Sequence, residues 1–340
     1  MGTSYSDFFK RTLIVAAVVA TPLLIWYLFP VVLMALGAVI LAMVLRLGAR
    51  PLMRWLAFPE TLALAVSGLL ILTAIAGTVY LFGTQLLAEF HDVMQRMISA
   101  TAAIRGTLQS DSIGRYLLHH VTGNFSLTEA LPGFLKVSTS FLEGIIIVLV
   151  SGAYMAAQPR LYRSGLVRLF PPRHHPRAAE ILDDIAEALR LWLVGQFCQM
   201  LLIGALATFA VWMIGVPSPL ALGLIAGMGE FIPYLGPILA AIPAVLVALT
   251  KSPDTALWTL CAYLVIHQIE GQVAAPLIQR HMVAIPPAVM LLGMIAVTYL
   301  FGAFAVIFAA PIAVVVFAAI NLIYMRDTLG EKTTLTRKLG

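Results

Sequence analysis

Residues 229–243 read GEFIPYLGPILAAIP, in which one carboxylate, three prolines and two glycines lie among apolar side chains. Pro and Gly disfavour a regular helix, and a carboxylate in hydrocarbon is costly. The chain on both sides is apolar, because Asp, Glu, Lys and Arg are absent from 191–229 and from 231–250. The stretch therefore predicts a break in an apolar helix, with Glu230 at the break.

The composition of the chain is that of an integral membrane protein. Of its 340 residues, 61% are hydrophobic and 11% are charged, whereas soluble domains carry roughly 25% charged residues. The uncharged blocks are long enough to cross a membrane, since a span needs about 20 apolar residues. The net charge of +5 comes from Lys and Arg in short segments between helices, which is the positive-inside pattern. We therefore expect an all-α, multi-pass membrane protein that binds membrane lipid and no nucleic acid.

The apolar runs predict about eight membrane segments. They lie near 12–29, 31–46, 62–83, 141–157, 192–214, 219–250, 255–277 and 286–325, with a tight turn at Pro30 between the first two. Arginines gather in 46–54 and 160–190. The positive-inside rule places both groups, and therefore both termini, in the cytoplasm.

Segment 84–140 is too polar to span a membrane. Its apolar side chains recur at steps of three and four residues, which predicts an external amphipathic helix. Such a helix caps the protein's own bundle, lies on the membrane or binds a partner. The expected organisation is three membrane helices in 1–83, this external segment in 84–140, a fourth membrane helix and an amphipathic cytoplasmic linker in 141–190, a core with two helical hairpins in 191–325, and a cytoplasmic tail in 326–340.

The two hairpins are inferred from length and charge. Segments 219–250 and 286–325 are too long for one ordinary span and too short for two, and each contains Pro or Gly near its middle. Helical hairpins that enter and leave on one side fit these lengths, and they keep Arg280 in the cytoplasm. The return arms GPILAAIPAVLVAL (236–249) and GAFAVIFAAPIAVVV (302–316) are alike. This likeness predicts an inverted repeat, which is common in secondary transporters.

Polar groups in the apolar second half are few, and they are the candidate residues for binding or coupling. Burying a carboxylate costs at least about 2.5 kcal/mol, so an intramembrane carboxylate indicates function. Glu230 lies where broken helix ends expose groups that bind ions or polar solutes, although a helix cap reaching water would also explain it. His267 and Glu270 share one helix face, and they either exchange protons or make a packing hydrogen bond. Gln268 adjoins them, and Gln196 and Gln199 lie one turn apart in an otherwise apolar helix.

A second group of residues is expected to shape the breaks and to act in gating. It consists of Gly229, Pro233, Tyr234, Gly236, Pro237, Gly271, Pro276, Gly302 and Pro311. The motifs GK[ST], GxSxG and HExxH are absent from the sequence. We therefore expect no ATP hydrolysis by a phosphate-binding loop, no enzymatic activity, and neither a metal nor a cofactor.

Three stretches resemble the autoinducer-2 exporter (AI-2E) family of bacterial permeases. They are IPYLGPILAAIPAVLVAL at 232–249, IEGQVAAPLIQRHMV at 269–283 and PAVMLLGMIAVTYLFGAFAVIFAAPIAVVV at 287–316. The recurring marks of the family are a Pro-Tyr-x-Gly-Pro stretch, here 233–237, and a Glu followed by Pro, here Glu270 and Pro276. The chain departs from the pattern after Pro276, where Leu277 replaces the usual Lys and His281 stands where Gly is expected.

The resemblance implies about eight membrane segments, a homo-oligomer that is a pentamer, and a place in the bacterial inner membrane. It also implies export of small molecules in some members and exchange of sodium or lithium for protons in others. We therefore expect an ion-gradient-driven secondary transporter that exports a small polar molecule, such as an autoinducer-2-like signal or another metabolite. The alternatives are an Na⁺(Li⁺)/H⁺ antiporter without an organic substrate, and a membrane scaffold or oligomeric pore.

Overall fold

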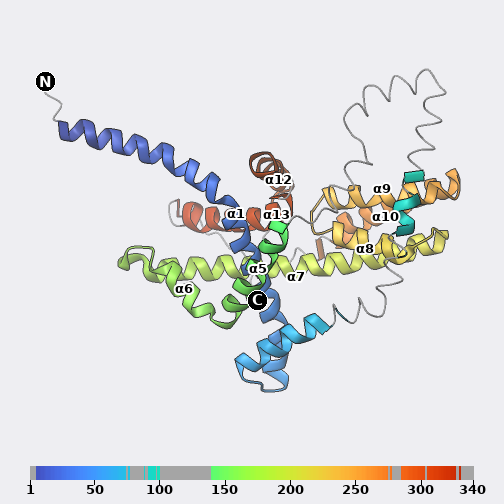
Figure 1. Ribbon diagram of the computed structural model, residues 1–340, viewed down its shortest axis with the longest axis horizontal. Coiled ribbons are helices and arrows are strands. Elements are labelled where there is room, and N and C mark those ends of the chain that lie inside the picture. Colours follow the sequence, from blue (N-terminus) through green and yellow to red (C-terminus); the bar gives the residue numbers. More distant parts are fainter. Residues whose placement is uncertain are drawn as a thin grey trace.

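The described part of the chain consists of helices and the turns between them (Figure 1). A computed structural model describes residues 5–73, 76, 88, 91–96, 98–99, 139–274, 276–277, 285–302, 305–326 and 329–330, with side chains only from 27 in the first range and from 144 in the range that begins at 139. Every regular element within these ranges is helical. The expected all-α class is thereby confirmed for the described chain.

Helix α1 (Tyr5–Trp55) is one continuous helix of 51 residues. The predicted turn at Pro30 is therefore wrong. At 1.5 Å per residue the helix is about 75 Å long. The helix continues through Pro30 because a proline removes a single backbone hydrogen bond, and an apolar helix can accommodate that loss without ending. A shorter apolar helix, Glu60–Thr73, packs back on the end of α1, where the Ser67 hydroxyl donates to the carbonyl oxygen of Leu45 at 2.9 Å.

Helices α5 (Thr139–Ala157) and α6 (Pro159–Val167) are joined by a bend of 91°. Gln158 precedes a proline and has a non-helical backbone, as expected for a residue in that position. Helix α5 packs along α1, so closely that a side chain on Gly152 would meet Leu41 and the carbonyl oxygen of Ala38. A short 3-10 turn, Pro172–His174, then leads into the next helix.

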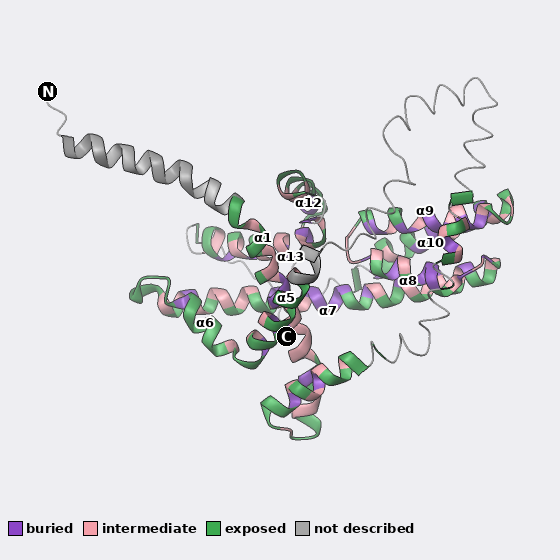
Figure 2. Ribbon diagram, in the orientation of Figure 1, coloured by how far each residue is buried: buried purple, intermediate pink, exposed green. Residues whose placement is uncertain are grey.

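Helix α7 (His175–Ile214) is 40 residues long and carries two hydrophobic clusters, one on each half (Figures 1 and 2). Its first half joins Leu189, Trp192 and Leu193 to Met290, Met294, Ala310 and Val314. Its second half joins Ile203, Ala207 and Val211 to Leu222, Ala226, Ala240, Ala244 and Val247. The amphipathic linker and the fifth predicted membrane helix thus form one element.

The remaining elements include two helix pairs, α8–α9 and α12–α13, each interrupted by a short break, with α10 and its π-helical turn between the two pairs. The elements are α8 (Pro219–Gly229), α9 (Leu235–Leu249), α10 (Pro253–Ile269) with a π-helical turn η2 (Glu270–Ala274), α12 (Pro287–Phe301), α13 (Val306–Ala319) and a second π-helical turn η4 (Ile320–Arg326). The first break is 230–234, which agrees with the predicted break at Glu230, and the second contains Gly302, whose φ of 89° favours glycine.

Three helices among the described residues are long and apolar enough to cross a membrane, or up to four if the bent α5–α6 pair forms one span. They are Tyr27–Trp55, Pro172–Ile214 and Val306–Arg326. A helical membrane protein is therefore supported. Eight segments, a re-entrant course for the two helix pairs and an inverted repeat stay predictions.

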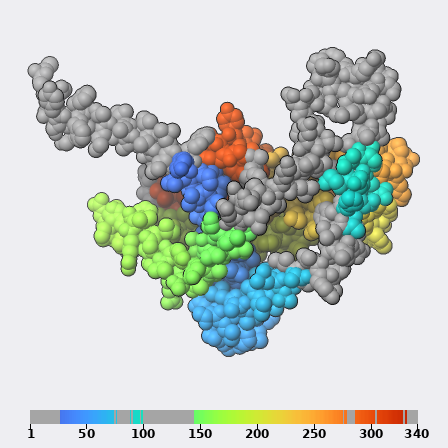
Figure 3. Space-filling model, in the orientation of Figure 1, coloured from blue at the N-terminus to red at the C-terminus, as the bar shows by residue number. Residues whose placement is uncertain are grey.

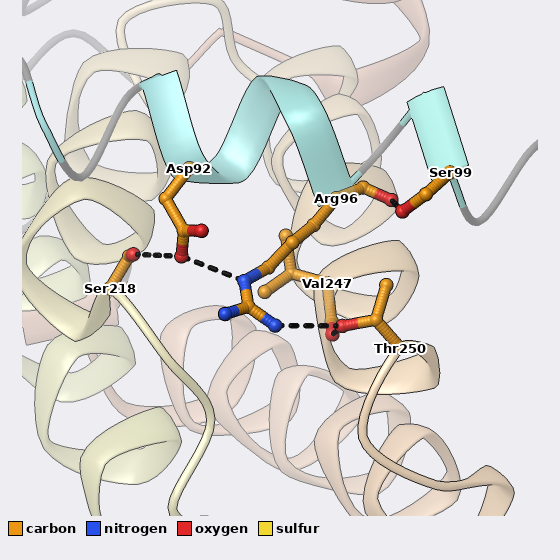
Figure 4. Close-up of polar contacts among 6 residues, drawn as sticks. All are labelled: Asp92, Arg96, Ser99, Ser218, Val247 and Thr250. Atoms are coloured by element: carbon orange, nitrogen blue, oxygen red, sulfur yellow. Dashed lines mark hydrogen bonds and ion pairs between the residues drawn. The ribbon is translucent and has the colours of Figure 1, made fainter.

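The described part of the polar segment packs on α8 and α9 (Figures 3 and 4). Val93 is 3% exposed and belongs to the cluster formed by α7, α8 and α9. Asp92 accepts hydrogen bonds from the Arg96 guanidinium at 2.7 Å and from Ser218 at 3.3 Å, and Arg96 also reaches Thr250 at 3.4 Å. These residues therefore cap the protein's own helices. Within 84–140 the structure describes only residues 88, 91–96, 98–99 and 139–140, so the remainder of the predicted external helix lies outside the described residues.

We predict that Val93→Ala destabilises the protein more than Arg96→Ala does. The first change removes two buried methyl groups, worth about 1.5 kcal/mol, whereas a partly exposed ion pair contributes at most about 1 kcal/mol. Thermal unfolding of the purified protein, followed by tryptophan fluorescence, measures both. A larger loss of stability for Arg96→Ala than for Val93→Ala would mean that the polar contacts, and not the burial of Val93, hold the described part of the polar segment on α8 and α9.

Candidate functional site

The break between α8 and α9 leaves backbone groups that need partners. In a continuous helix the carbonyl oxygen of Glu230 would accept from the amide of residue 234. The chain instead makes tight turns, with the amide of Ile232 donating to Gly229 at 3.0 Å and that of Gly236 donating to Ile232 at 2.8 Å. The side-chain amide of Gln196, from α7, donates to the carbonyl oxygen of Glu230 at 2.6 Å. Gln196 is 3% exposed, so this buried carbonyl is satisfied from a neighbouring helix.

Close approach of α8 and α9 at the break requires glycine. A Cβ atom on Gly236 would overlap the carbonyl oxygen of Gly229. Between these two residues, Tyr234 has a φ of 65°, which costs a non-glycine residue about 1–3 kcal/mol. The Pro-Tyr-x-Gly-Pro stretch thus forms a tight, strained chain reversal, in which Pro233 and Tyr234 belong to the break and Gly236 and Pro237 to the first turn of α9.

Two carboxyl groups meet at this break. The side chain of Glu230 is 1% exposed and its Oε2 atom has no hydrogen-bond partner among the described residues. The Glu230 carboxyl is near enough to that of Glu270 for the two to interact electrostatically. Glu270 in turn lies 3.1 Å from Nδ1 of His267, measured from its Oε2 atom. Two neighbouring carboxylates repel each other when both are ionised, so the pair favours a bound proton or cation.

Glu270 is placed by a change of helix type. Helix α10 ends at Ile269, and residues 270–274 continue as a π-helical turn. Such turns are rare and occur frequently at functional sites. Gly271 lies inside this turn and Pro276 follows it, so both lie next to the carboxyl pair in the chain.

A cavity of about 440 Å³ lies beside the pair and is lined by residues of α7, α8, α9, α10 and η2. Its walls are apolar except for Tyr263, His267 and Glu270. The hydroxyl of Tyr263 is buried and has no partner among the described residues. Tyr263 is not among the residues predicted from the sequence, although Tyr263, His267 and Glu270 are spaced four and three residues apart, which places them on one helix face.

The structure therefore brings together Glu230, Glu270, His267 and Gln196, with the predicted Gly and Pro residues of the first break beside them. Three predicted residues lie elsewhere, namely Gln268, Gly302 and Pro311. Gln268 lines a shallow exposed groove on α10 with Gln272. Gly302 and Pro311 belong to the second helix pair, and neither lines the cavity at the first break. The two helix pairs still meet, because Phe231 and Ile232 of the first break pack on the cluster that α12 and α13 share with α7.

Comparisons with known proteins agree with the resemblance. The family model "AI-2E family transporter" matches residues 14–325. "Putative transport protein YrrI" of Bacillus subtilis is 26% identical over 277 residues, which is 77% of this chain and 78% of that protein. A "Putative transport protein" of Thermotoga maritima is 24% identical over 262 residues, or 74% of this chain and 78% of that protein. "AI-2 transport protein TqsA" of Escherichia coli is 21% identical over 294 residues, or 84% and 83%.

We predict that Gln196→Leu lowers the free energy of unfolding by about 1–3 kcal/mol, because it leaves the buried carbonyl of Glu230 without a donor. Gln199→Leu is the matched control. Gln199 lies one turn further along α7, is similarly buried, and makes no side-chain hydrogen bond within the described chain. Thermal unfolding in detergent compares the two variants, and equal midpoints would refute the structural role given to Gln196.

Gly236→Ala is expected to prevent normal folding, since the added methyl group occupies the position of the Gly229 carbonyl oxygen. The matched control is Gly293→Ala in α12, where an added Cβ meets nothing within 4 Å. The yield of monodisperse protein in size-exclusion chromatography measures the effect. Equal yields for both variants would show that α8 and α9 approach less closely than described.

Proposed function

The chain belongs to the AI-2E transporter family, and from that premise we propose that it is an ion-gradient-driven secondary transporter which exports a small polar molecule. Transport across a membrane is the function that its family supports, and the family is not an enzymatic one. Export, ion coupling and the class of substrate are our proposals. We further propose an inner-membrane location, cytoplasmic termini and a homo-oligomeric, pentameric assembly.

One observation carries the proposal of coupling. Glu230 is a buried carboxyl at a helix break, it interacts electrostatically with a second carboxyl, and its Oε2 atom lacks a partner among the described residues. Buried carboxyl groups in membrane proteins are expensive and occur in proton and ion pathways. In this proposal the Glu230–Glu270 pair binds the coupling ion, which is H⁺, Na⁺ or Li⁺. Binding removes the repulsion between the two carboxylates and so changes the stability of the break.

His267 gives the pair a route to the cavity. Its ring lines the cavity, its side chain is 49% exposed, and its Nδ1 atom is 3.1 Å from Oε2 of Glu270. Glu270 is the intermediate member, with a side chain 12% exposed. Histidine exchanges protons near neutral pH. We therefore assign to His267 the transfer of protons between the cavity and the carboxyl pair.

The cavity supports an organic substrate with polar groups at one end. Its walls are almost entirely apolar, and its polar groups, from Tyr263, His267 and Glu270, come from one face of α10 and η2. A volume of about 440 Å³ lies within the usual range for small-molecule sites, about 300–1,000 Å³. The E. coli relative is named for the transport of AI-2, and an AI-2-like signal or another small metabolite is of a suitable size.

The second candidate function is an Na⁺(Li⁺)/H⁺ antiporter without an organic substrate. The observation in its favour is the carboxyl pair itself, since two carboxylates that bind either one proton or one cation are sufficient for exchange. A scaffold or pore has less support. The described residues of the polar segment pack on the protein's own α8 and α9, through Val93, Asp92 and Arg96, and this leaves fewer of them for a partner.

We predict that Glu230→Gln and Glu270→Gln each abolish ion-coupled proton movement, because the amide cannot take up or release the proton. The full chain is reconstituted in liposomes that contain a pH-sensitive dye, and a sodium or lithium gradient is imposed. Gln268→Ala is the control, since Gln268 lies on another surface of α10. Wild-type rates in both Glu variants would refute the coupling site.

The same liposomes separate the two candidate functions. Loaded with a mixture of small metabolites, they release a particular solute under the ion gradient if the protein is an exporter, and the solute is identified by mass spectrometry. Proton movement that is unchanged by every solute in the mixture favours the antiporter. If thermal unfolding shows that the reconstituted protein is folded, and neither solute release nor proton movement is observed, both candidate functions are contradicted.

A further inference from the structure

A second cavity, of about 580 Å³, lies away from the helix break. Its walls come from α1, α5, α6 and the first half of α7, with Val315 of α13. The proposed transport site uses none of its lining residues. The volume is again within the range of ligand-binding pockets, about 300–1,000 Å³.

The cavity is apolar in one part and basic in another. Its apolar lining includes Leu36, Val39 and Met43 of α1 and Ile185 and Leu189 of α7, which are buried or half-buried. Its basic lining residues are Arg46, Arg50, Arg160, Arg163 and Arg190, and its acidic lining residues are Asp183 and Glu187. Positive charges are therefore in clear excess.

Two of the arginines are not neutralised by an ion pair. Arg163 donates to both carboxylate oxygens of Asp183, at 2.6 Å each. Arg190 pairs with Glu187, and Arg46 pairs with Glu60 outside the cavity. In the part of the chain that is described, Arg50 and Arg160 make no ion pair, although Arg50 lies in the electrostatic field of Glu187.

If α5 crosses the membrane, the course of α6 brings this basic part to the level of the lipid headgroups. Since α6 turns 91° away from α5, it lies along the membrane surface if α5 crosses the membrane. The apolar side chains of Leu161 and Leu166 are 60% and 50% exposed. An amphipathic helix with exposed apolar and basic residues is typical of the membrane interface. Arg160 and Arg163 then lie beside headgroups, and the apolar part of the cavity lies at the depth of acyl chains.

We propose that this cavity is a binding site for an anionic phospholipid. The phosphate group lies against Arg50 and Arg160, and an acyl chain fills the apolar part between α1 and α7. Arginine suits this ligand because its planar guanidinium donates two parallel hydrogen bonds to a phosphate. Basic pockets between membrane helices are known to select anionic headgroups.

The two parts of the cavity exclude simpler ligands on chemical grounds. Inorganic phosphate would use the arginines and leave the apolar walls exposed to water, which is unfavourable. A zwitterionic lipid would fill the apolar part, but its own positive group would offset the attraction of the unpaired arginines. An anionic phospholipid satisfies both parts.

The test uses the full chain in lipid nanodiscs that contain phosphatidylcholine with a minor fraction of phosphatidylglycerol. Native mass spectrometry of the released protein counts the lipid of each kind that stays bound. We expect wild-type protein to retain phosphatidylglycerol in preference to phosphatidylcholine. The double variant Arg50→Ala/Arg160→Ala is expected to bind phosphatidylglycerol about 30-fold more weakly, at about 1 kcal/mol per arginine and about 1.4 kcal/mol per tenfold.

The matched control is Arg54→Ala/Arg168→Ala, which removes two exposed arginines from the same segments that do not line the cavity. It should retain phosphatidylglycerol as the wild type does. Equal losses in the two double variants, or no preference in the wild type, would overturn the proposal, because the attraction would then be a general one to basic surface residues.

Two further measurements on folded protein keep the proposal testable if the double alanine variant does not fold. Arg50→Lys/Arg160→Lys keeps the charge and loses the paired hydrogen bonds, so its retention should fall between those of the wild type and the alanine variant. Adding inorganic phosphate to the wild type should leave the bound lipid in place. Complete displacement by phosphate would show that the site binds a free anion, and the proposal of a lipid would fail.

Discussion

Satisfying backbone polar groups inside an apolar fold is the constraint on which the candidate site depends. A helix break in such surroundings frees carbonyl and amide groups that water does not reach. Here the break at 230–234 closes most of them in tight turns and presents one carbonyl, that of Glu230, to Gln196 of α7. The position of the break relative to α7 is therefore fixed by a hydrogen bond, and the Glu230 side chain is fixed with it.

The carboxyl pair follows from the same arrangement. Glu230 is brought by the α8–α9 break and Glu270 by the π-helical turn after α10. Each residue lies where a regular helix is interrupted, so the local departure from helical geometry sets the direction of each side chain. Interruptions of this kind are favourable only when neighbouring helices compensate them. The two hydrophobic clusters along α7 supply that support, since one holds α8, α9 and α10 and the other holds α12 and α13.

Local sequence patterns predicted most of the helices, both breaks and most of the residues that the structure brings together at the candidate site, because Pro, Gly and isolated polar residues in apolar runs act through their immediate neighbours. They failed where the outcome depends on distant contacts. Pro30 has the same chemistry as Pro233, yet the helix continues through the first and stops before the second. Gln196 donates to a residue 34 positions away. Tyr263 becomes a candidate only because it lines a cavity formed by residues of four helices. Its spacing from His267 is visible in the sequence, but the cavity is not.

The continuity of α7 has a mechanical consequence. Arg190, which lines the basic cavity, and Gln196, which holds the break, are six residues apart on one unbroken helix, or about 9 Å at 1.5 Å per residue. A helix of this kind transmits tilt and rotation as a stiff lever. A tilt or rotation of the first half of α7 would therefore also move the residues that line the other cavity, so the two cavities are mechanically connected through one helix.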